Sequence, residues 1–370
     1  MTRADVLHPV PRASSISITF FTRYSLRVDP QHRVTITDVA REAGVSVATV
    51  SKVINERYGV AAATGAKVRA VIETLGYESS LVARSLRSHH TNVIGILVAD
   101  FEPFSAELLK GAAQAIRGAG YELLAYSAGG AAEELVGWER RYLSRLSGTL
   151  IDGAVLVTPT VVDAQYGTPV VAVDPHTGRS GMPTVDSDNL KGAMVATEHL
   201  LSLGHRRIGF LGGRPDLESA RLREEGYRAA LTAAGIAIDP ELIRVGGYRP
   251  ESAEEPAHAL LTLPERPTAV FAANDLSAIR TMQVAQRLGL DVPSDVSVIG
   301  FDNVPESGLA SPPLTTIAQP IQEMGRHAVR MLLELLSGRE LDMTHVTLPT
   351  ELIVRQSCGS VPAQVGAPRA

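Results

Sequence analysis

A small face in the N-terminal part of the chain offers chemistry suited to double-stranded DNA. Within the run VTITDVAREAGVSVATVSKVIN, which covers residues 34–55, four side chains point away from the apolar positions: Val47, Ala48, Ser51 and Lys52. The ammonium of Lys52 can donate to guanine O6 or N7, and Val47 can pack against a thymine methyl group. These four positions are therefore candidates to enter a major groove.

Polar side chains that follow apolar runs offer a second chemistry, the binding of a small ligand. In sheets of parallel strands, ligands bind beyond the carboxyl ends of the strands, so the residues directly after each run are expected to line a pocket. In this chain they are Asp100, Phe101, Asp174, Asn274 and Asp302.

The DNA-directed face requires two short helices joined by a tight turn. Thr35 is placed to cap a first helix that starts at about Ile36, and Asp38 can return a hydrogen bond to the cap amide. Gly44 lies where the chain must leave this helix in a left-handed conformation. Ser46 can cap the second helix, whose apolar face packs back onto the first. Two packed helices of an ordinary bundle would explain the apolar stripes but not the alanine–glycine turn.

A third helix is predicted from about Ala63 to Leu75, so residues 34–79 form a small all-α helix-turn-helix domain. Residues 80–92 are predicted to contain a hinge helix. The segment SLVARSLRS is amphipathic but too short to be a stable helix alone, and it is expected to become ordered on a partner. The alternative is a polar linker. Residues 1–33 are predicted to be a disordered extension.

From Val93 onward, short apolar runs alternate with helical patterns. Runs that are apolar at nearly every position indicate strands buried on both faces, and their alternation with helices indicates β-α-β units with parallel sheets. The polar stretch 175–187 divides them into two groups, so two doubly wound lobes are predicted. The expected strands are 93–100, 121–127, 152–159, 169–174, 207–213, 268–274 and 296–302, and the helices are 105–118, 133–147, 188–203, 218–234, 251–263, 275–289 and 320–337.

Composition agrees with a multi-domain protein that meets DNA at one end. The chain has 370 residues and a net charge of −5, but residues 1–92 hold 12 Lys and Arg against 7 Asp and Glu. The single cysteine, Cys358, excludes an internal disulfide and suggests a cytoplasmic location, and no cofactor or metal-ligand set is evident. No apolar stretch reaches the roughly 20 residues that span a bilayer.

Several motifs in order resemble those of LacI-family transcriptional regulators. TITDVAREAGVSVATVSKVIN resembles the DNA-reading domain of that family and ARSLR its hinge helix, while HLLSLGHRRIGFLGG, AVFAANDLSAI, DVSVIGFDN and PPLTTIAQP resemble stretches of its ligand-binding core. The resemblance implies a periplasmic-binding-protein-like core at 93–357, with lobe 1 at about 93–187 plus 319–345, lobe 2 at about 188–318 plus 346–357, and a flexible tail at 358–370.

The resemblance also assigns roles to particular side chains. It implies that Val47, Ala48 and Lys52 face base edges, and that the hinge leucine, Leu86, wedges into the minor groove beside Arg84. Hydroxyls and amides on the helix edge would touch phosphates without reading sequence. The full predicted DNA-binding set is Thr35, Ser46, Val47, Ala48, Thr49, Ser51, Lys52, Asn55, Ala83, Arg84 and Leu86.

For the ligand, the resemblance implies that Arg223, Asn274 and Asp302 hold an effector, with Phe101 or Phe104 stacking on the apolar face of a sugar. Each of the three polar residues alone could be a capping or salt-bridging group, and Asp275 could simply cap the helix that follows. The full predicted effector set is Phe101, Phe104, Asp174, Arg223, Asn274, Asp302 and Gln319.

Two departures from the family pattern concern the DNA-binding domain. The third helix begins with Val60-Ala61 and Thr64-Gly65, where the family usually has valine-serine and threonine-arginine. Loss of the serine removes a cap worth roughly 1 kcal/mol, and glycine loosens the helix. The non-polar pair Val47-Ala48 makes few hydrogen bonds to bases, which limits direct readout.

The resulting hypothesis is a homodimeric repressor of carbohydrate-utilisation genes that binds a pseudo-palindromic operator and is induced by a mono- or oligosaccharide. A sugar is favoured because a carboxylate such as Asp302 suits hydroxyl donors better than a purine carbonyl. Corepression by a purine-like ligand stays open. A transport-type solute-binding protein would not need residues 34–88, and an enzyme would need a phosphate-binding loop or a nucleophile with its base, neither of which is evident.

Overall fold

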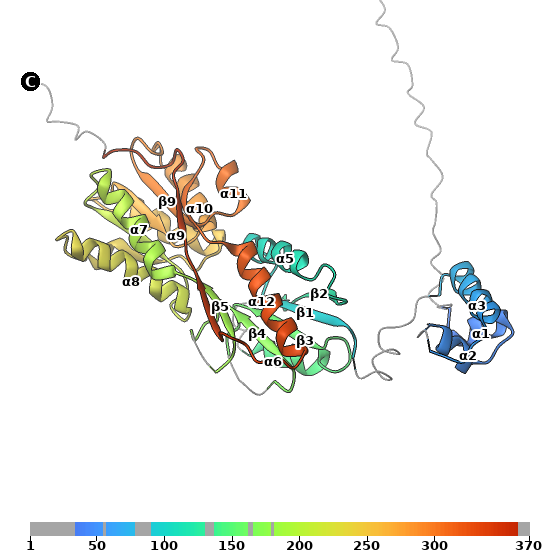
Figure 1. Ribbon diagram of the computed structural model, residues 1–370. Coiled ribbons are helices and arrows are strands. Elements are labelled where there is room, and N and C mark those ends of the chain that lie inside the picture. Colours follow the sequence, from blue (N-terminus) through green and yellow to red (C-terminus); the bar gives the residue numbers. More distant parts are fainter. Residues whose placement is uncertain are drawn as a thin grey trace, which may run out of the picture. The chain divides into compact units, whose positions relative to one another are not determined.

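The computed structural model describes residues 34–54, 57–77, 90–129, 137–161, 166–178 and 181–361. The chain divides into two separately packed units, Met1–Ser79 and Ser80–Ala370 (Figure 1). The predicted extension at 1–33 and the predicted hinge helix, up to residue 89, lie outside the described residues.

The N-terminal unit contains the three predicted helices, α1 (Ile36–Ala43), α2 (Val47–Ile54) and α3 (Ala62–Leu75). Thr35 caps α1 as predicted, because its hydroxyl accepts from the Asp38 amide at 3.3 Å and its own amide donates to the Asp38 carboxylate at 2.9 Å. Gly44 has a φ of 64°, the left-handed conformation that the turn requires. The helices enclose a small core of Val39, Ala40, Ala43, Val50, Val53 and Val68.

The larger unit consists of two lobes, each built on a six-stranded sheet. Lobe 1 has the order β11 (His345–Leu348), β5 (Thr184–Ser187), β4 (Val170–Val173), β3 (Gly153–Val157), β1 (Val93–Val98), β2 (Glu122–Ser127). Lobe 2 has the order β12 (Glu351–Ile353), β10 (Thr315–Ala318), β9 (Ser297–Asp302), β8 (Ala269–Ala272), β6 (Ile208–Gly212), β7 (Ile243–Val245). All pairings are parallel except that of β10 with β12.

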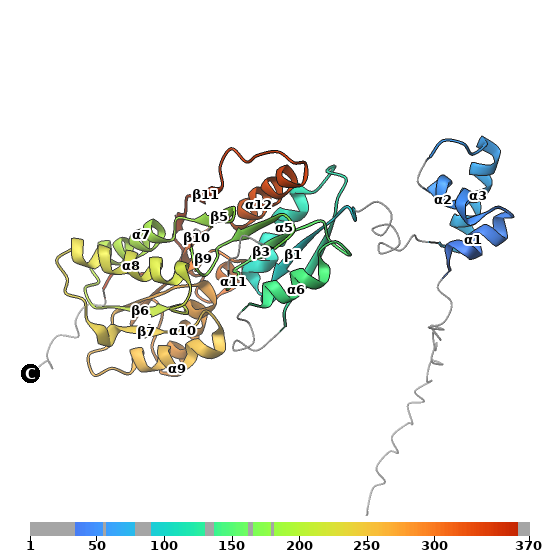
Figure 2. The same cartoon turned by 90° about the horizontal axis from the view of Figure 1, so that it is seen from below.

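Helices cover both faces of each sheet, as the predicted doubly wound architecture requires (Figure 2). In lobe 1 these are α5 (Pro103–Ala115) and α12 (Ile321–Leu336) on one face and α6 (Trp138–Leu146) on the other. In lobe 2 they are α7 (Asn189–Ser202) and α8 (Glu218–Ala233) on one face, and α9 (Pro250–Leu261) and α10 (Asp275–Arg287) on the other. The short elements α11 (Pro305–Leu309) and η2 (Pro240–Leu242) complete lobe 2.

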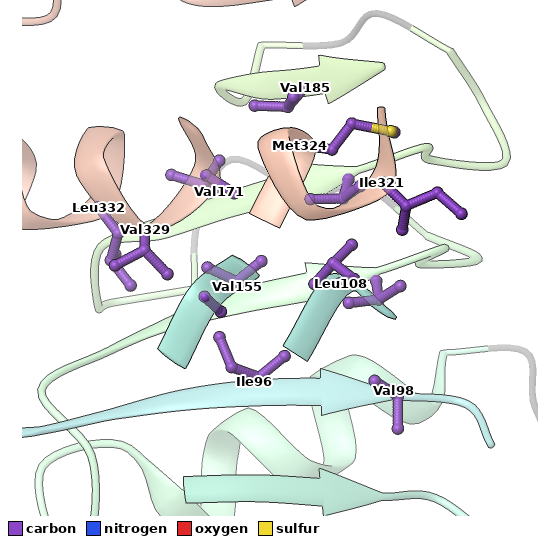
Figure 3. Packing of buried hydrophobic residues seen from close by; sticks show 14 of the residues in the cluster. Ile96, Val98, Leu108, Val155, Val171, Val185, Ile321, Met324, Val329 and Leu332 are labelled. Carbon is purple, nitrogen blue, oxygen red and sulfur yellow. The ribbon is translucent and has the colours of Figure 1, made fainter. Parts of the chain in front are cut away.

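The central strands are apolar throughout because both of their faces are buried. Along β1, Ile96 and Val98 point to α5 and α12, where they meet Leu108 and Met324 (Figure 3). Leu97 points to the opposite face and packs with residues of α6. Each such fully buried aliphatic side chain contributes roughly 1.5–3 kcal/mol of transfer free energy.

The helices α5 and α12 approach each other closely at two glycines. A methyl group added at Gly111 would overlap the carbonyl oxygen of Gln322, and one added at Gly325 would overlap that of Leu108. Only glycine permits this distance between the two backbones.

The chain passes between the lobes three times, from β5 to α7, from β10 to α12 and from β11 to β12. The predicted boundary after residue 345 is wrong for residues 346–348, because β11 pairs in parallel with β5 in lobe 1, whereas β12 lies in lobe 2 as predicted. The stretch 175–187, predicted as a polar divider, contains β5. The strands β5 and β11 were missed because they are four residues long and carry polar side chains.

The prediction of a flexible tail from residue 358 is wrong for its first four residues. The Gly359 amide donates to Ser297 Oγ at 3.0 Å, and the Val361 amide donates to the Leu203 carbonyl oxygen at 3.1 Å. These bonds attach the segment to lobe 2. Residues 362–370 lie outside the described part of the chain.

Candidate DNA interface and effector cavity

The second helix of the N-terminal unit presents the predicted face to solvent. Val47, Ala48 and Lys52 are exposed, whereas Val50 and Val53 of the same helix are buried. Val47 is 37% exposed. The three side chains thus form an uncovered patch of methyl groups and one ammonium.

Hydroxyl groups at the start of α2 fix its first turn. Ser46 Oγ accepts from the Thr49 amide at 3.1 Å, so Ser46 caps the helix as predicted, and it lies 2.9 Å from Thr49 Oγ1. Thr35 is occupied by its cap on α1, while Ser51 is half-buried on the outer side of α2. The other predicted DNA-binding residues, Asn55, Ala83, Arg84 and Leu86, lie outside the described residues.

The third helix starts without a side-chain cap, as predicted from the loss of the serine that the family usually has at this position. Its cap position, Ala61, makes no side-chain hydrogen bond to the first turn, and Gly65 lies in the second turn. The first amide groups of α3 therefore lack the side-chain acceptor that α1 and α2 have.

Six of the seven predicted effector residues line one cavity of the larger unit. They are Phe104, Asp174, Arg223, Asn274, Asp302 and Gln319. The seventh, Phe101, is not part of the cavity wall, and 56% of its side chain is exposed. Its two neighbours, Asp100 and Glu102, do line the cavity.

Arg223, on α8, is held rigidly at the centre of this cavity. Only 3% of the residue is exposed. Its Nε donates to Asn189 Oδ1 at 2.8 Å, and its Nη1 donates to the Ala273 carbonyl oxygen. The guanidinium carbon also lies 3.9 Å from the centre of the Phe301 ring, a cation–π contact. These contacts leave the guanidinium little freedom to reorient.

Asp302, at the end of β9, accepts one hydrogen bond and forms one ion pair with residues of the cavity wall. Gln319 Nε2 donates to its Oδ1 at 2.6 Å, and Arg223 Nη1 lies 3.5 Å from the same oxygen. Gln319 in turn accepts from Ser187 Oγ, so the network joins the end of β5 to the end of β9. Burial raises the pKa of Asp302 to about 7, although Arg223 opposes the shift.

Asn274 shapes the cavity through its cap on α10. Its Oδ1 accepts from the Ser277 amide at 3.0 Å, and its Nδ2 donates to the Tyr248 carbonyl oxygen at 2.9 Å. The alternative that Asp275 caps this helix is wrong. Asp275 is fully buried and accepts from the Val304 amide and from Thr316 Oγ1, and burial raises its pKa well above the usual value.

Asp174 follows β4 with a φ of 48°, an uncommon conformation for a residue with a side chain. Burial raises the pKa of its carboxyl, whereas Arg223 and a hydrogen bond with Ser219 lower it. Asp174 therefore faces Arg223 from lobe 1, opposite Asp302 on lobe 2.

Polar contacts join the lobes on two sides of the cavity. Arg249 Nη2 of lobe 2 lies 3.0 Å from Asp100 Oδ2 of lobe 1. On the other side, His176 Nδ1 lies 3.3 Å from Asp216 Oδ2, and the Glu218 amide donates to the His176 carbonyl oxygen at 3.0 Å. Burial lowers the pKa of His176 to about 4, so its ring is neutral near pH 7.

Several cavity residues were missed by the sequence reasoning. They are Glu102, His176, Arg214, Tyr248 and Arg249, among others in loops after the strands. Glu102 is two residues beyond Asp100, but the chain bends at residues 99–100, so the sequence pattern did not place its side chain. In the described part of the chain no group of side chains fits a metal ion, and no helix has the length and apolar character of a membrane crossing.

Comparisons with known proteins agree with this arrangement. The family described as bacterial regulatory proteins, lacI family, matches residues 35–80, and a periplasmic binding protein-like domain matches residues 197–358. The HTH-type transcriptional repressor PurR of Photobacterium profundum is 35% identical over 331 residues, which are 87% of this chain and 98% of that protein. PurR of Yersinia pestis (strain Pestoides F) is 36% identical over 337 residues, 89% of this chain and 98% of that protein.

Solved structures are similar over the same length. The transcriptional regulator CelR in complex with cellobiose has a TM-score of 0.66 and 31% identity, covering 88% of this chain and all of that chain. The Lac repressor dimer bound to operator and the anti-inducer ONPF has a TM-score of 0.75 and 28% identity. The match covers 89% of this chain and 100% of that chain. Because full-length relatives above 30% identity share both units, this chain belongs to the LacI family and is a DNA-binding transcriptional repressor, not an enzyme.

Proposed function

We propose that this repressor acts in the cytoplasm as a homodimer on a pseudo-palindromic operator, and that a sugar-like effector bound in the cavity releases it. Two copies of α2 would enter successive major grooves, one in each half-site. In each copy Lys52 would read a guanine, while Val47 and Ala48 would pack on thymine methyl groups. Ser46, Thr49, Ser51 and Asn55 would contact phosphates, and Ala83, Arg84 and Leu86 would enter the minor groove.

The observation that carries the sugar proposal is the dense set of fixed polar groups around Arg223. Carboxyl, guanidinium and amide groups from both lobes converge on the cavity, and the hydroxyls of Thr158, Thr160 and Ser219 lie in its wall. A ligand with many hydroxyl groups can satisfy donors and acceptors in so many directions. Phe104 offers one apolar face on which a sugar ring can stack. The similarity to CelR, whose structure contains cellobiose, supports the same class.

Control of DNA binding follows from the position of the cavity between the lobes. An effector that changes the angle between the lobes would change how the two copies present their hinge segments. Because coupling is reciprocal, an inducer that weakens operator binding 100-fold must itself bind 100-fold more weakly to the DNA complex, which corresponds to roughly 2.7 kcal/mol.

The test begins with the operator. The purified protein is mixed with sheared genomic DNA, the retained fragments are sequenced, and affinity for the common site is measured by fluorescence anisotropy with and without a panel of mono- and oligosaccharides. We expect one sugar to lower operator affinity at least tenfold. If no fragment is preferred over bulk DNA at moderate salt, the operator proposal fails.

The Lys52→Ala variant tests the reading face in the same assay. Loss of a base contact costs about 1–3 kcal/mol, so we expect affinity for the operator to fall roughly 5- to 150-fold while binding to unrelated DNA changes much less. Lys191→Ala, the same change on an exposed position of α7, is the matched control and should leave both affinities unchanged. An equal loss on operator and unrelated DNA would show that Lys52 contacts only the backbone.

A purine-like corepressor is the second candidate, and the 35–36% identity to repressors named PurR supports it. A planar base would stack on Phe104 and use the Arg223 guanidinium and the Asp302 carboxyl for its polar edge. The two candidates predict opposite changes in operator affinity. A corepressor such as hypoxanthine or guanine would strengthen operator binding, whereas a sugar inducer would weaken it.

A further inference from the structure

The cavity contains more carboxyl groups than guanidinium groups to balance them. Of its three arginines, Arg249 is paired with Asp100 at 3.0 Å and Arg214 with Asp216 at 2.6 Å. Arg223 lies 3.5 Å from Asp302. Of the two further carboxyls of the wall, Asp174 faces Arg223, which also lies beside Asp302, and Glu102 forms no ion pair with a described residue. His176 is neutral near pH 7 and supplies no charge.

Glu102 is the cavity carboxyl with the fewest contacts. It precedes α5 but does not cap it, since its side chain makes no hydrogen bond to the first turn. No described residue forms a hydrogen bond or an ion pair with its carboxylate. The pKa of Glu102 is raised by burial and by the nearby Asp100, while Arg249 opposes the shift. A half-buried carboxyl without a donor lacks the compensation that such groups normally have.

Tyr248 supplies a second unmatched group in the same cavity. Its hydroxyl oxygen is buried and has no partner at hydrogen-bond geometry among the described residues, and the Ser219 hydroxyl, which acts to lower its pKa, does the same for Asp174. Tyr248 precedes Arg249, whose charge acts on Glu102. Buried polar groups in native proteins are rarely left without a partner, so an unmatched hydroxyl in a cavity wall indicates a polar ligand.

We propose that the effector carries a cationic amino group and that Glu102 is the residue that selects it, with amino sugars as the ligand class. This inference rests on the proposed sugar-binding function and narrows it. An ammonium group donates to Glu102 and supplies the positive charge that the cavity lacks, and charge-assisted hydrogen bonds are about twice as strong as neutral ones. A neutral sugar of the same shape would leave Glu102 without a counter-charge.

The experiment compares matched pairs of ligands on the intact protein by isothermal titration calorimetry. The pairs are glucosamine and glucose, galactosamine and galactose, and mannosamine and mannose, with N-acetylglucosamine as a probe that keeps the bulk and loses the charge. We expect at least one amino sugar to bind ten or more times tighter than both its neutral partner and its acetylated form. Glu102→Gln should remove most of that difference.

Glu122→Gln is the matched control, because it makes the same substitution on an exposed position of β2 in the same lobe. It should preserve the tenfold preference. Thermal unfolding of both variants confirms that each is folded before the affinities are compared.

A pH series separates a charge effect from a change of shape. Below neutral pH the ligand stays cationic, so the wild-type affinity for the amino sugar should rise as Glu102 loses its proton, and this rise should be smaller in Glu102→Gln. Asp174 and Asp302 also titrate in this cavity, whose other charged side chains are Asp100, Arg214, Arg223 and Arg249. The difference between wild type and variant is therefore the decisive quantity.

Equal affinity for amino and neutral sugars, or an unchanged preference in Glu102→Gln, would overturn the amino-sugar proposal and leave the sugar-responsive repressor intact. Failure of every sugar to bind would overturn both.

Discussion

At the scale of single residues, the polar cavity residues that directly follow buried strands could be predicted from the sequence. Asp174, Asn274 and Asp302 all come directly after apolar runs, and the cavity contains all three. Their individual tasks were not predictable. Asn274 uses both ends of its amide within the protein, so it shapes the wall more than it offers free hydrogen bonds. Phe101 was misplaced because sequence alone does not say to which side a residue turns after its strand ends.

Asp302 makes the stability of the core depend on pH. Because burial raises its pKa from 3.8 to about 7, the folded protein binds more protons than the unfolded chain between these values. The free energy of unfolding should therefore fall as pH rises through this window. In Asp302→Asn this fall should be smaller, and we expect the drop in Tm between pH 5 and pH 7.5 to shrink by a few degrees, since about 2–4 °C corresponds to 1 kcal/mol in a domain of this kind.

Differential scanning fluorimetry across this pH range provides the measurement, with Asp342→Asn at an exposed position as the control. Asp275 is buried beside Asp302 and its pKa is raised too, so part of the pH dependence should persist in Asp302→Asn. An identical pH profile in wild type and Asp302→Asn would show that Asp302 titrates as an ordinary exposed carboxyl.

At the scale of elements, the sequence predicted those that are long or apolar throughout and missed strands that are short and carry polar side chains. The central strands were recognised because burial on both faces demands apolar residues throughout. By contrast, β5 is only TVDS, and β11 and β12 are partly exposed edge strands of four and three residues. Their strand conformation depends on pairing with distant partners, which leaves little trace in their own residues.

The contact of α5 with α12 gives a prediction about packing. Gly111→Ala should force the two helices apart, because its new methyl group would meet the backbone of Gln322. Overpacking of this kind costs typically about 1–3 kcal/mol, so we expect a Tm several degrees lower than that of the wild type.

Gly308→Ala is the control for this substitution. Gly308 lies in α11 with no atom close to the position of the added methyl group. Its Tm should stay the same or rise slightly, since alanine favours a helix over glycine by roughly 1 kcal/mol. If both variants lost the same stability, a general intolerance of alanine would be indicated and not the α5–α12 contact.

At the scale of the whole molecule, the two units have separate hydrophobic cores. Removal of residues 1–89 should therefore abolish operator binding and leave effector affinity within about twofold of the DNA-free full-length protein, because every described cavity residue lies beyond residue 90. Anisotropy with the operator and calorimetry with the effector measure the two properties. Loss of effector binding on truncation would mean that the N-terminal unit supports the core.

The architecture of the whole was the best predicted level. The sequence indicated a DNA-binding domain followed by two lobes in three ways. These are the order of the motifs, the alternation of strands and helices, and the basic N-terminal part that precedes an acidic remainder. The lobe boundaries were harder to predict from the sequence. The last passage between the lobes and the attachment of residues 358–361 depend on backbone hydrogen bonds, which side-chain patterns do not encode.

The three passages of the chain between the lobes limit the motions open to this protein. A single tether would let one lobe twist freely against the other, whereas three neighbouring tethers resist torsion and leave bending as the soft direction. The last of them continues into the segment fastened to Ser297 and Leu203, so a fluorescent label attached after Val361 would travel with lobe 2. Energy transfer from such a label to one on α5 would follow opening and closing directly.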